Sequence, residues 1–204
     1  PFYQIYWNEG KLNREIIKDY AEQYYQHVKA FPRYISATHS ICEDIEKRRI
    51  LLENLQDEEN KDGDHPKLWK NFAKALGADD KKIENAKLDW FTKDMIDNFF
   101  AQARKSYAEG LASLYTYERQ IPEIAETKIQ GLKKFYGVRS KEGLEFFEAH
   151  KSADVIHRAE CEKLLDGLSE EEQKKAENAS LLTARYLWNF LSGMVSKHKL
   201  QQAA

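Results

Sequence analysis

"HKSADVIH", residues 150–157, places two histidines and one aspartate at positions i, i+4 and i+7 of a helix. At about 100° per residue, His150, Asp154 and His157 lie within roughly 60° of one another. The same side of this helix carries large apolar residues and a cysteine, which are Phe146, Phe147, Cys161, Leu164, Leu165 and Leu168. The polar triplet therefore faces the core, where an unpaired charge is costly and either finds a partner or is neutralised.

The rest of the chain repeats its hydrophobic residues with the helical period, and the alternating pattern of strands is absent. The first helix is expected to end before the Phe31-Pro32 step, and Pro122 is expected to kink or break a long amphipathic stretch. The expected helices span about 14–29, a short segment to 41, 43–59, 66–77, 89–120, 122–137, 140–167 and 169 onward. The fold class is therefore all-α, a compact bundle of seven or eight helices in one domain over residues 1–204.

The composition excludes several classes of partner. Charged residues make up 32% of the 204 residues, but the net charge of −2 gives no basic surface for nucleic acid or anionic lipid. No apolar run approaches the roughly 18 residues that span a bilayer, and no charged-then-apolar leader is visible. Cys42 and Cys161 are too few for a disulfide framework and form no C-x-x-C pair. We expect a cytoplasmic protein with reduced thiols and neither a nucleic-acid nor a membrane partner.

A metal ion is the economical partner for the triplet, because neutral histidine and ionised aspartate are ligands for iron, manganese or zinc. The alternative is chance, since six histidines in 204 residues will sometimes fall into register without binding anything. Other carboxylates and imidazoles that face the core help to decide between these two interpretations.

Three further residues have this character. Glu118, in "LYTYERQIP", lies on an apolar helical stripe, Glu58 follows Leu51 and Leu55 on one face, and His65 comes after the "NKDGD" turn. Each has an ordinary explanation: a partly buried acid bonded to a tyrosine, a frayed acidic helix end, and a cap residue on a surface loop. Together with the triplet they supply three carboxylates and three imidazoles, which are enough ligands for two metal ions.

The ligand types indicate which metals to expect. Structural zinc sites prefer thiolates, and both cysteines lie outside the predicted set, so iron or manganese is favoured over zinc. A ferritin-type site would contain Glu-x-x-His pairs, and the sequence has none among these residues. The site would therefore be a di-metal centre of a different lineage.

A resemblance to a known family rests on six stretches that cover most of residues 1–165. They are "PFYQIYWNEGKL", "YYQHVKAFPRYISATHS", "LLENLQDEEN", "HPKLW", "GLASLYTYERQIPEIAETKI" and "FFEAHKSADVIHRAE". In these stretches the chain resembles the CADD family and, more broadly, the haem-oxygenase-like di-metal oxidases with their fold relatives, the TenA thiaminases and the PqqC oxygenases. The resemblance implies a seven-helix bundle, usually a homodimer. It also implies two metal ions bound by Glu58, His65, Glu118, His150, Asp154 and His157.

The resemblance further implies an unusual reaction. CADD-like proteins supply para-aminobenzoate for folate synthesis in an O2-dependent reaction of two metal ions, iron with iron or iron with manganese. The reaction consumes one of the protein's own tyrosines, whose position matches Tyr3, and a lysine that matches Lys128 is thought to donate the amino group. A lysine is a nitrogen source only when its amine is neutral, and burial lowers the pKa of a lysine towards that state.

These two residues also have ordinary interpretations. Tyr3 lies in the aromatic cluster "PFYQIYW", where a tyrosine more often packs than reacts, and Lys128 lies at the border of the Glu118 stripe, where most lysines extend to solvent. The other aromatic candidates are either hydrogen-bond donors around the cavity or core residues whose hydroxyls are satisfied. They are Tyr20, Tyr24, Tyr25 and Tyr117.

Other functions remain to be weighed. A TenA thiaminase needs a nucleophilic cysteine near mid-chain, and "ASLYTYE" has none. PqqC activates oxygen without metal, which a full ligand set argues against. The enzymatic alternative is a related di-metal oxidase that acts on an external small molecule. The non-enzymatic alternative is an effector exported to a host, where it would bind death-domain proteins.

Overall fold

The computed structural model describes residues 2–61 and 63–200, and within α8 the side chains of residues 152–156 lie outside the described part. Every regular element in the described ranges is helical, and none is a strand, so the predicted all-α class is confirmed. The elements are η1 (Phe2–Trp7, a π-helix), α1 (Arg14–Ser40), α2 (Ile45–Glu58), α3 (His65–Ala75), α4 (Asp80–Glu84), α5 (Trp90–Lys105), α6 (Tyr107–Glu118), α7 (Ile121–Phe135), α8 (Lys141–Asp166) and α9 (Glu170–Lys197).

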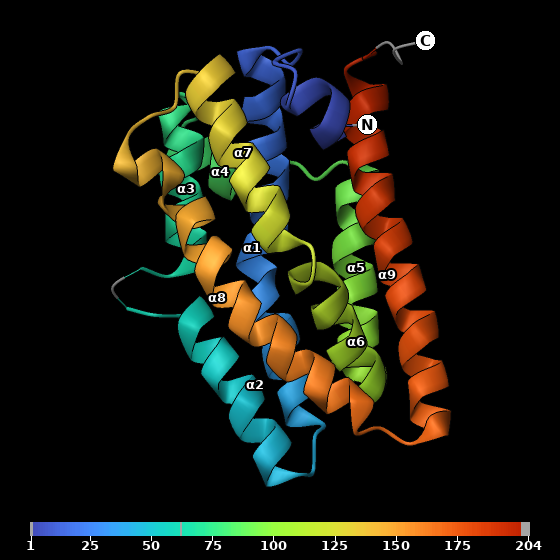
Figure 1. Cartoon of the computed structure of the whole chain (residues 1–204). Helices are drawn as coiled ribbons and strands as arrows, with labels where there is room; N and C mark the ends of the chain where they lie inside the picture. Colours follow the sequence, from blue (N-terminus) through green and yellow to red (C-terminus); the bar gives the residue numbers. More distant parts are fainter. Residues whose placement is uncertain (1, 62, 201–204) are drawn as a thin grey trace.

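The helix α1 runs through the middle of the bundle and packs against α2, α3, α5 and α6. Figure 1 shows α9 along one side of the molecule, with α2 and α8 toward the other. The α9 helix packs on α5 and α6, while α8 packs on α3, α6 and α7. This arrangement brings the end of α2, the start of α3 and the middle of α8 around one region of the core. No helix in the described part of the chain is long and apolar enough to cross a membrane.

Most helix ends follow the signals in the sequence. Asn13 and Ser140 cap α1 and α8 by accepting hydrogen bonds from backbone N–H groups, and Ser169 opens α9 with a complete capping box. Glycines at 77 and 137 follow α3 and α7 with positive φ angles, which favour glycine over other residues. Pro122 lies in the first turn of α7, where its missing N–H costs nothing.

The expected break at Phe31-Pro32 is wrong, because α1 continues through Pro32 to Ser40. Proline removes only one hydrogen bond of the helix. Phe31, Pro32, Tyr34 and Ile35 are all buried, so tertiary packing outweighs the lost bond. The continuous helix α1 therefore contributes buried residues to the core over its whole length.

Two other boundaries differ from the prediction. The stretch 89–120 forms two helices, because Ser106 has an extended backbone (φ −157°, ψ 163°) and its side chain caps the backbone N–H of Glu109 in α6. The polar segment after Gly77 is not a plain loop but contains the one-turn-long helix α4. Its Ile83 is fully buried and anchors it to the core.

The N-terminal π-helix is held against α7 by a close contact. Trp7 is 0% exposed, and a Cβ placed on Gly131 would lie 2.7 Å from two atoms of the Trp7 indole ring. A hydrogen bond from Tyr136 Oη to the Trp7 carbonyl oxygen, 2.9 Å, fixes the same turn. Glycine at 131 therefore allows the segment that carries Tyr3 to approach α7.

We expect Gly131→Ala to destabilise the protein by about 1–3 kcal/mol, because the new methyl group would overpack the Trp7 ring. Helix propensity alone would favour alanine by up to about 1 kcal/mol. Urea denaturation measures the difference. Gly167→Ala is the matched control, since its nearest contacts are at 3.6 Å or more. An unchanged or increased stability of Gly131→Ala would contradict the close packing of η1 on α7.

Candidate metal centre

Three of the predicted ligands come together in the core. Glu58 is the last residue of α2, His65 is the first residue of α3, and His150 lies in the middle of α8. Each offers one nitrogen or oxygen atom such that all three atoms lie within 4.8 Å of one another, and all three side chains are buried. His65 is thus not a cap residue on a surface loop. Among the described residues, this is the group of histidines, cysteines and acids whose geometry suits a metal ion.

Glu58 and His65 are already paired. His65 Nδ1 lies 2.8 Å from Glu58 Oε2. Burial alone would lower the pKa of His65, but the Glu58 carboxylate, helped by Asp57 and Asp64, outweighs burial and raises the pKa. The carboxylates around His65 therefore create a negative electrostatic potential that stabilises positive charge.

His150 has one ring nitrogen committed to the backbone. Its Nδ1–H donates to the carbonyl oxygen of Phe146 at 2.7 Å, which leaves Nε2 as the lone-pair donor. Burial, with His65 nearby, holds the pKa of His150 well below its usual value, so the ring is neutral. Metal-binding histidines commonly donate their second N–H in this way, which fixes the orientation of the ring.

Glu118, at the end of α6, is the most deeply buried acid near this group. It is 1% exposed, accepts a hydrogen bond from Asn54 Nδ2 at 2.7 Å, and lies 3.6 Å from the Cys161 thiol. Burial raises the pKa of Glu118 to about 7, and the neighbouring His157 opposes the effect. A buried carboxylate with no full positive charge beside it is a candidate ligand for a cation.

His157 lies on the same helix as His150 and is also buried. Its Nε2 lies 3.1 Å from Asp57 Oδ2 on α2. A carboxylate only accepts, so Nε2–H donates and the other ring nitrogen, Nδ1, is the one suited to a metal ion. Asp154, the remaining predicted ligand, falls within 152–156 and so lies outside the described residues.

The sequence did not single out the residues that hold these ligands in place. Asn54 lies one helical turn before Glu58, Asp57 directly precedes it, and Cys161 lies one turn after His157. Cys161 was set aside as outside the site, yet its thiol contacts Glu118. Its position on the helical stripe of His150 and His157 was the available signal.

A second polar group lies beside the metal ligands, around Lys128. This lysine on α7 is 4% exposed, and its Nζ lies 2.8 Å from Tyr20 Oη and 4.4 Å from the centre of the Tyr3 ring. Tyr20 Oη is in turn 2.8 Å from Tyr3 Oη. Burial lowers the pKa of Lys128 to about 7 and raises the pKa of Tyr3 and Tyr20 well above the usual value. Lys128 therefore does not extend to solvent.

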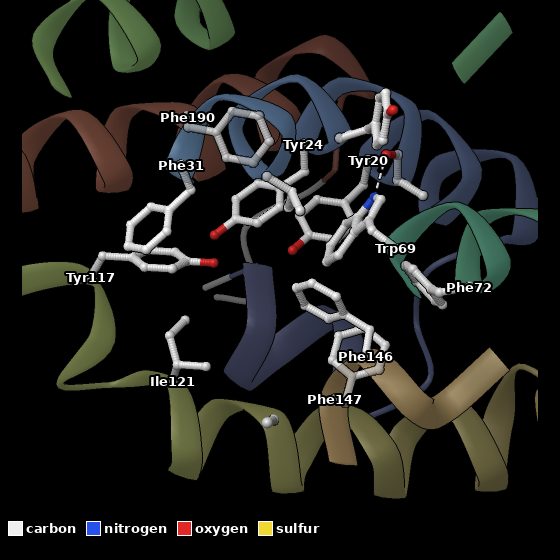
Figure 2. Packing of buried hydrophobic residues seen from close by; sticks show 14 of the residues in the cluster. Tyr20, Tyr24, Phe31, Trp69, Phe72, Tyr117, Ile121, Phe146, Phe147 and Phe190 are labelled. Carbon is white, nitrogen blue, oxygen red and sulfur yellow. Dashed lines mark hydrogen bonds between the residues drawn. The ribbon is translucent and has the colours of Figure 1, made fainter. Parts of the chain in front are cut away.

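Aromatic rings enclose this second group. Figure 2 shows the hydroxyl groups of Tyr20, Tyr24 and Tyr117 pointing toward the space between the rings, with Phe146 and Phe147 of α8 beyond them. Tyr20 and Tyr24 stack with ring centres 5.3 Å apart. Tyr24 and Tyr117 line the cavity beside Lys128, whereas Tyr20 is fully buried and its hydroxyl contacts Lys128 and Tyr3 directly. Tyr25 differs, because its hydroxyl donates to Glu84 on the outer side of α1, 3.0 Å away.

Comparison with known proteins places the chain in a family. A family model described as "Iron-containing redox enzyme" matches residues 18–188. The chain belongs to this haem-oxygenase-like family of iron-containing redox enzymes. It is therefore an enzyme of the oxidoreductase class, as the ligand pattern predicted.

Curated relatives of similar length share about 40% of their residues with this chain. The chain is 41% identical over 197 residues to a protein of Chlamydia pneumoniae named 4-aminobenzoate synthase, covering 96% of this chain and 87% of the relative. It is 40% identical over 196 residues to a protein of the same name from Chlamydia muridarum, at 96% and 83% coverage. A third, from Nitrosomonas europaea, has the same name and is 39% identical over 206 residues, at 95% and 83% coverage.

Solved structures confirm the fold. A TenA homologue from Pseudomonas syringae superposes with a TM-score of 0.81 at 17% identity, covering 96% of this chain and 84% of that one. A CADD-like protein of unknown function from Nostoc punctiforme gives a TM-score of 0.76 at 15% identity, covering 91% and 83%. At this level of identity the likeness concerns the fold alone, and it confirms the predicted haem-oxygenase-like bundle.

The donor set fits the iron of the family. Carboxylate and imidazole donors suit iron, the described donors are buried, and the acids around His65 stabilise positive charge there. Glu58, His65, His150 and His157 would hold metal, and Glu118 lies close enough to Glu58 and His157 to interact with both electrostatically. The arrangement is therefore compatible with more than one metal ion.

We expect Glu118→Gln to raise the stability of the metal-free protein at pH 8 by about 1–3 kcal/mol. The folded protein holds the Glu118 proton with a pKa of about 7, above the ordinary value of 4.5, so Glu118 costs stability as pH rises from 4.5 through 7. The amide avoids this cost and still accepts the bond from Asn54. Thermal denaturation against pH measures the effect.

The same variant should respond less to iron. Ferrous iron at a hundred times its Kd would stabilise each occupied site of the parent protein by about 2.7 kcal/mol, and Glu118→Gln should lose part of that gain and bind less iron per chain. Glu109→Gln is the matched control, because Glu109 is a buried acid of the same helix that pairs with Lys105 away from the site. Equal iron content in the parent and in Glu118→Gln would remove Glu118 from the ligand set.

Proposed function

We propose that this protein is an O2-dependent 4-aminobenzoate synthase that consumes its own Tyr3 and takes the amino nitrogen from Lys128. The name shared by relatives at 39–41% identity over at least 95% of the chain supports the product. The arrangement of Tyr3, Tyr20 and Lys128 supports the choice of residues. It brings an amine and a phenol into one hydrogen-bonded group around the buried Tyr20.

The observation that carries this proposal is the position of Lys128. Its amine lies 4.4 Å from the centre of the Tyr3 ring, and burial lowers the pKa to about 7, so a large fraction of the amine is neutral near neutral pH. Only a neutral amine has the lone pair needed to form a bond to carbon. A surface lysine would be almost fully protonated.

Tyr20 joins the two reacting groups. It hydrogen-bonds both Lys128 Nζ and Tyr3 Oη at 2.8 Å, so it holds the amine and the phenol in fixed relative positions. Tyr20 is fully buried, which keeps water from competing for either contact. The chain thereby provides orientation and exclusion of water before any oxidation occurs.

The metal site supplies the oxidising power. Two transition metal ions, iron with iron or iron with manganese, would be held by Glu58, His65, Glu118, His150 and His157, together with Asp154, and when reduced they would provide the activation of O2. The side chains between the metal ligand His150 and the second polar group include the buried rings of Phe146 and Tyr24, which restrict the room for water there.

Expectations about partners stay predictions. A homodimer and the binding of host death-domain proteins would need contacts with other chains. The location of the protein, cytoplasmic or exported to a host, is likewise a prediction. The enzymatic alternative, oxidation of an external small molecule, is separated from the proposed function by the origin of the product's ring atoms.

Protein labelled with ring-¹³C tyrosine, loaded with ferrous iron and exposed to O2 without added substrate should release labelled 4-aminobenzoate, at most one molecule per chain. Tyr3→Phe should release none, because the substituted ring lacks the hydroxyl that is bonded to Tyr20 and activates the ring. Mass spectrometry of the product and of the intact chain measures both.

Tyr25→Phe is the control, since it removes a tyrosine hydroxyl that contacts Glu84 and not the cavity. It should give the yield of the parent protein. Labelled product from Tyr3→Phe would move the consumed residue to another tyrosine. Unlabelled product that appears only with added substrate would favour the external-substrate enzyme.

The rate of product formation in a single turnover should rise about tenfold per pH unit below pH 7 and level off above it. The reason is that Lys128, with a pKa of about 7, becomes neutral over this range. Lys128→Arg, which stays protonated, should give no product at any pH, and ¹⁵N-lysine labelling should place ¹⁵N in the product. A rate that is independent of pH from 6 to 8, or product without ¹⁵N, would exclude Lys128 as the donor.

A further inference from the structure

Three cavities lie in a row between the surface and the metal ligands. The outermost, here called the outer pocket, has a volume of about 750 Å³ and lies between η1, α7 and α9. Trp188, which is 59% exposed, forms part of its wall together with Leu191 and Tyr3. The outer pocket is therefore accessible from outside the bundle.

The second cavity, the inner chamber, has a volume of about 220 Å³. It shares Tyr3, Gln120, Ile124, Trp188 and Leu191 with the outer pocket, so the two spaces adjoin. Among the described residues that line it, Lys128 is the one charged group. The remaining wall is mostly apolar and aromatic. A molecule of ring size fits in this chamber beside Tyr3 and Lys128.

The third cavity is much smaller, about 10 Å³, and it reaches His150. It shares Tyr24, Tyr117, Ile121, Ile124 and Lys128 with the inner chamber. A space of this size holds one molecule as small as water or O2. Nothing as large as an aromatic ring fits between the inner chamber and the metal ligand.

Ile124 has a special position in this row. Among the described residues it alone lines all three cavities. It lies on α7 one helical turn before Lys128, and its side chain is partly buried. Ile124 therefore stands at the point where the three spaces meet.

We propose that the three cavities form the path by which O2 reaches the metal ligands, with Ile124 as its gate and the smallest cavity as a size filter. The walls suit this role, because an apolar gas enters an apolar passage without losing hydrogen bonds to water. The inference rests on the proposed function for its use of O2. The filter also keeps any ring-sized molecule at Tyr3 and Lys128, away from His150.

Xenon tests the path without iron or turnover, because xenon occupies dry apolar cavities of proteins. In metal-free protein with ¹³C-labelled methyl groups, xenon should shift the signals of Ile121, Ile124, Leu187 and Leu191. Ile124→Trp, whose side chain would fill the meeting point, should abolish the shifts of Ile121. Ile45→Trp on α2, at a position 53% exposed and far from the path, should leave them unchanged.

The second measurement is the rate of oxidation of iron-loaded protein by O2 in stopped flow. Ile124→Trp should lower the second-order rate constant about tenfold or more. Ile124→Val should have the rate constant of the parent protein. The iron content of all variants should be the same. Should Ile124→Trp fail to fold, Ala184→Trp fills the inner chamber from an exposed position on α9.

The outcomes separate this inference from the proposed function. Xenon shifts that are absent in the parent protein, or an O2 rate that neither Trp variant changes, would overturn the path. A rate that depends on Ile124 in a protein that makes no 4-aminobenzoate would support the path and reject the proposed function. Loss of xenon shifts with an unchanged O2 rate would show that O2 enters elsewhere, which also overturns the path.

Discussion

The cost of burying charge without water governs the interior of this bundle. Glu58, Glu118 and Lys128 are all nearly inaccessible to solvent, yet no ion pair joins the two acids to the lysine in the described structure. At the metal end, buried carboxylates lie beside imidazoles, and this set of donors suits a cation. At the other end, the described contacts of the Lys128 amine are with phenols and aromatic rings, and burial lowers its pKa to about 7. The same constraint therefore favours a bound cation at one end and a partly neutral amine at the other.

The surroundings of the histidines determine which nitrogen each offers. His150 donates Nδ1–H to a carbonyl oxygen of its own helix, whereas His157 is tied through Nε2 to Asp57 of α2. The two imidazoles of one helix thus use opposite ring nitrogens for these two contacts. Because a backbone carbonyl cannot rotate away, His150 is fixed by the helix itself, while His157 depends on how α2 packs against α8.

The sequence predicted much of this architecture, and the exceptions have physical causes. Helical periodicity placed His150 and His157 on the core face because burial repeats every turn. The continuation of α1 through Pro32 escaped prediction, since tertiary packing rather than local preference decides it. The burial of Lys128 was not predicted either, because a helical wheel gives only the direction of a side chain from the helix axis. The π-helix η1, which covers Lys128, comes from the other end of the chain.

The partners of the ligands were harder to predict than the ligands. Asn54 and Asp57 are polar residues on a helix rich in charge, and nothing local distinguishes them from solvent-facing neighbours. Their roles arise from the packing of α2 beside α6 and α8, which brings Glu118 and His157 to them. Contacts between residues about 60 to 100 positions apart depend on the completed fold and leave no periodic trace in the sequence.

Tyr3 has two roles that together account for a single turnover under the proposed function. Its ring lines both the outer pocket and the inner chamber, so it is a part of the wall as well as the proposed substrate. Loss of the ring would remove this part of the wall between the two spaces. Under the proposed function the spent protein lacks both the phenol of Tyr3 and the amine nitrogen of Lys128, because the product contains them, and the reaction ends after one round.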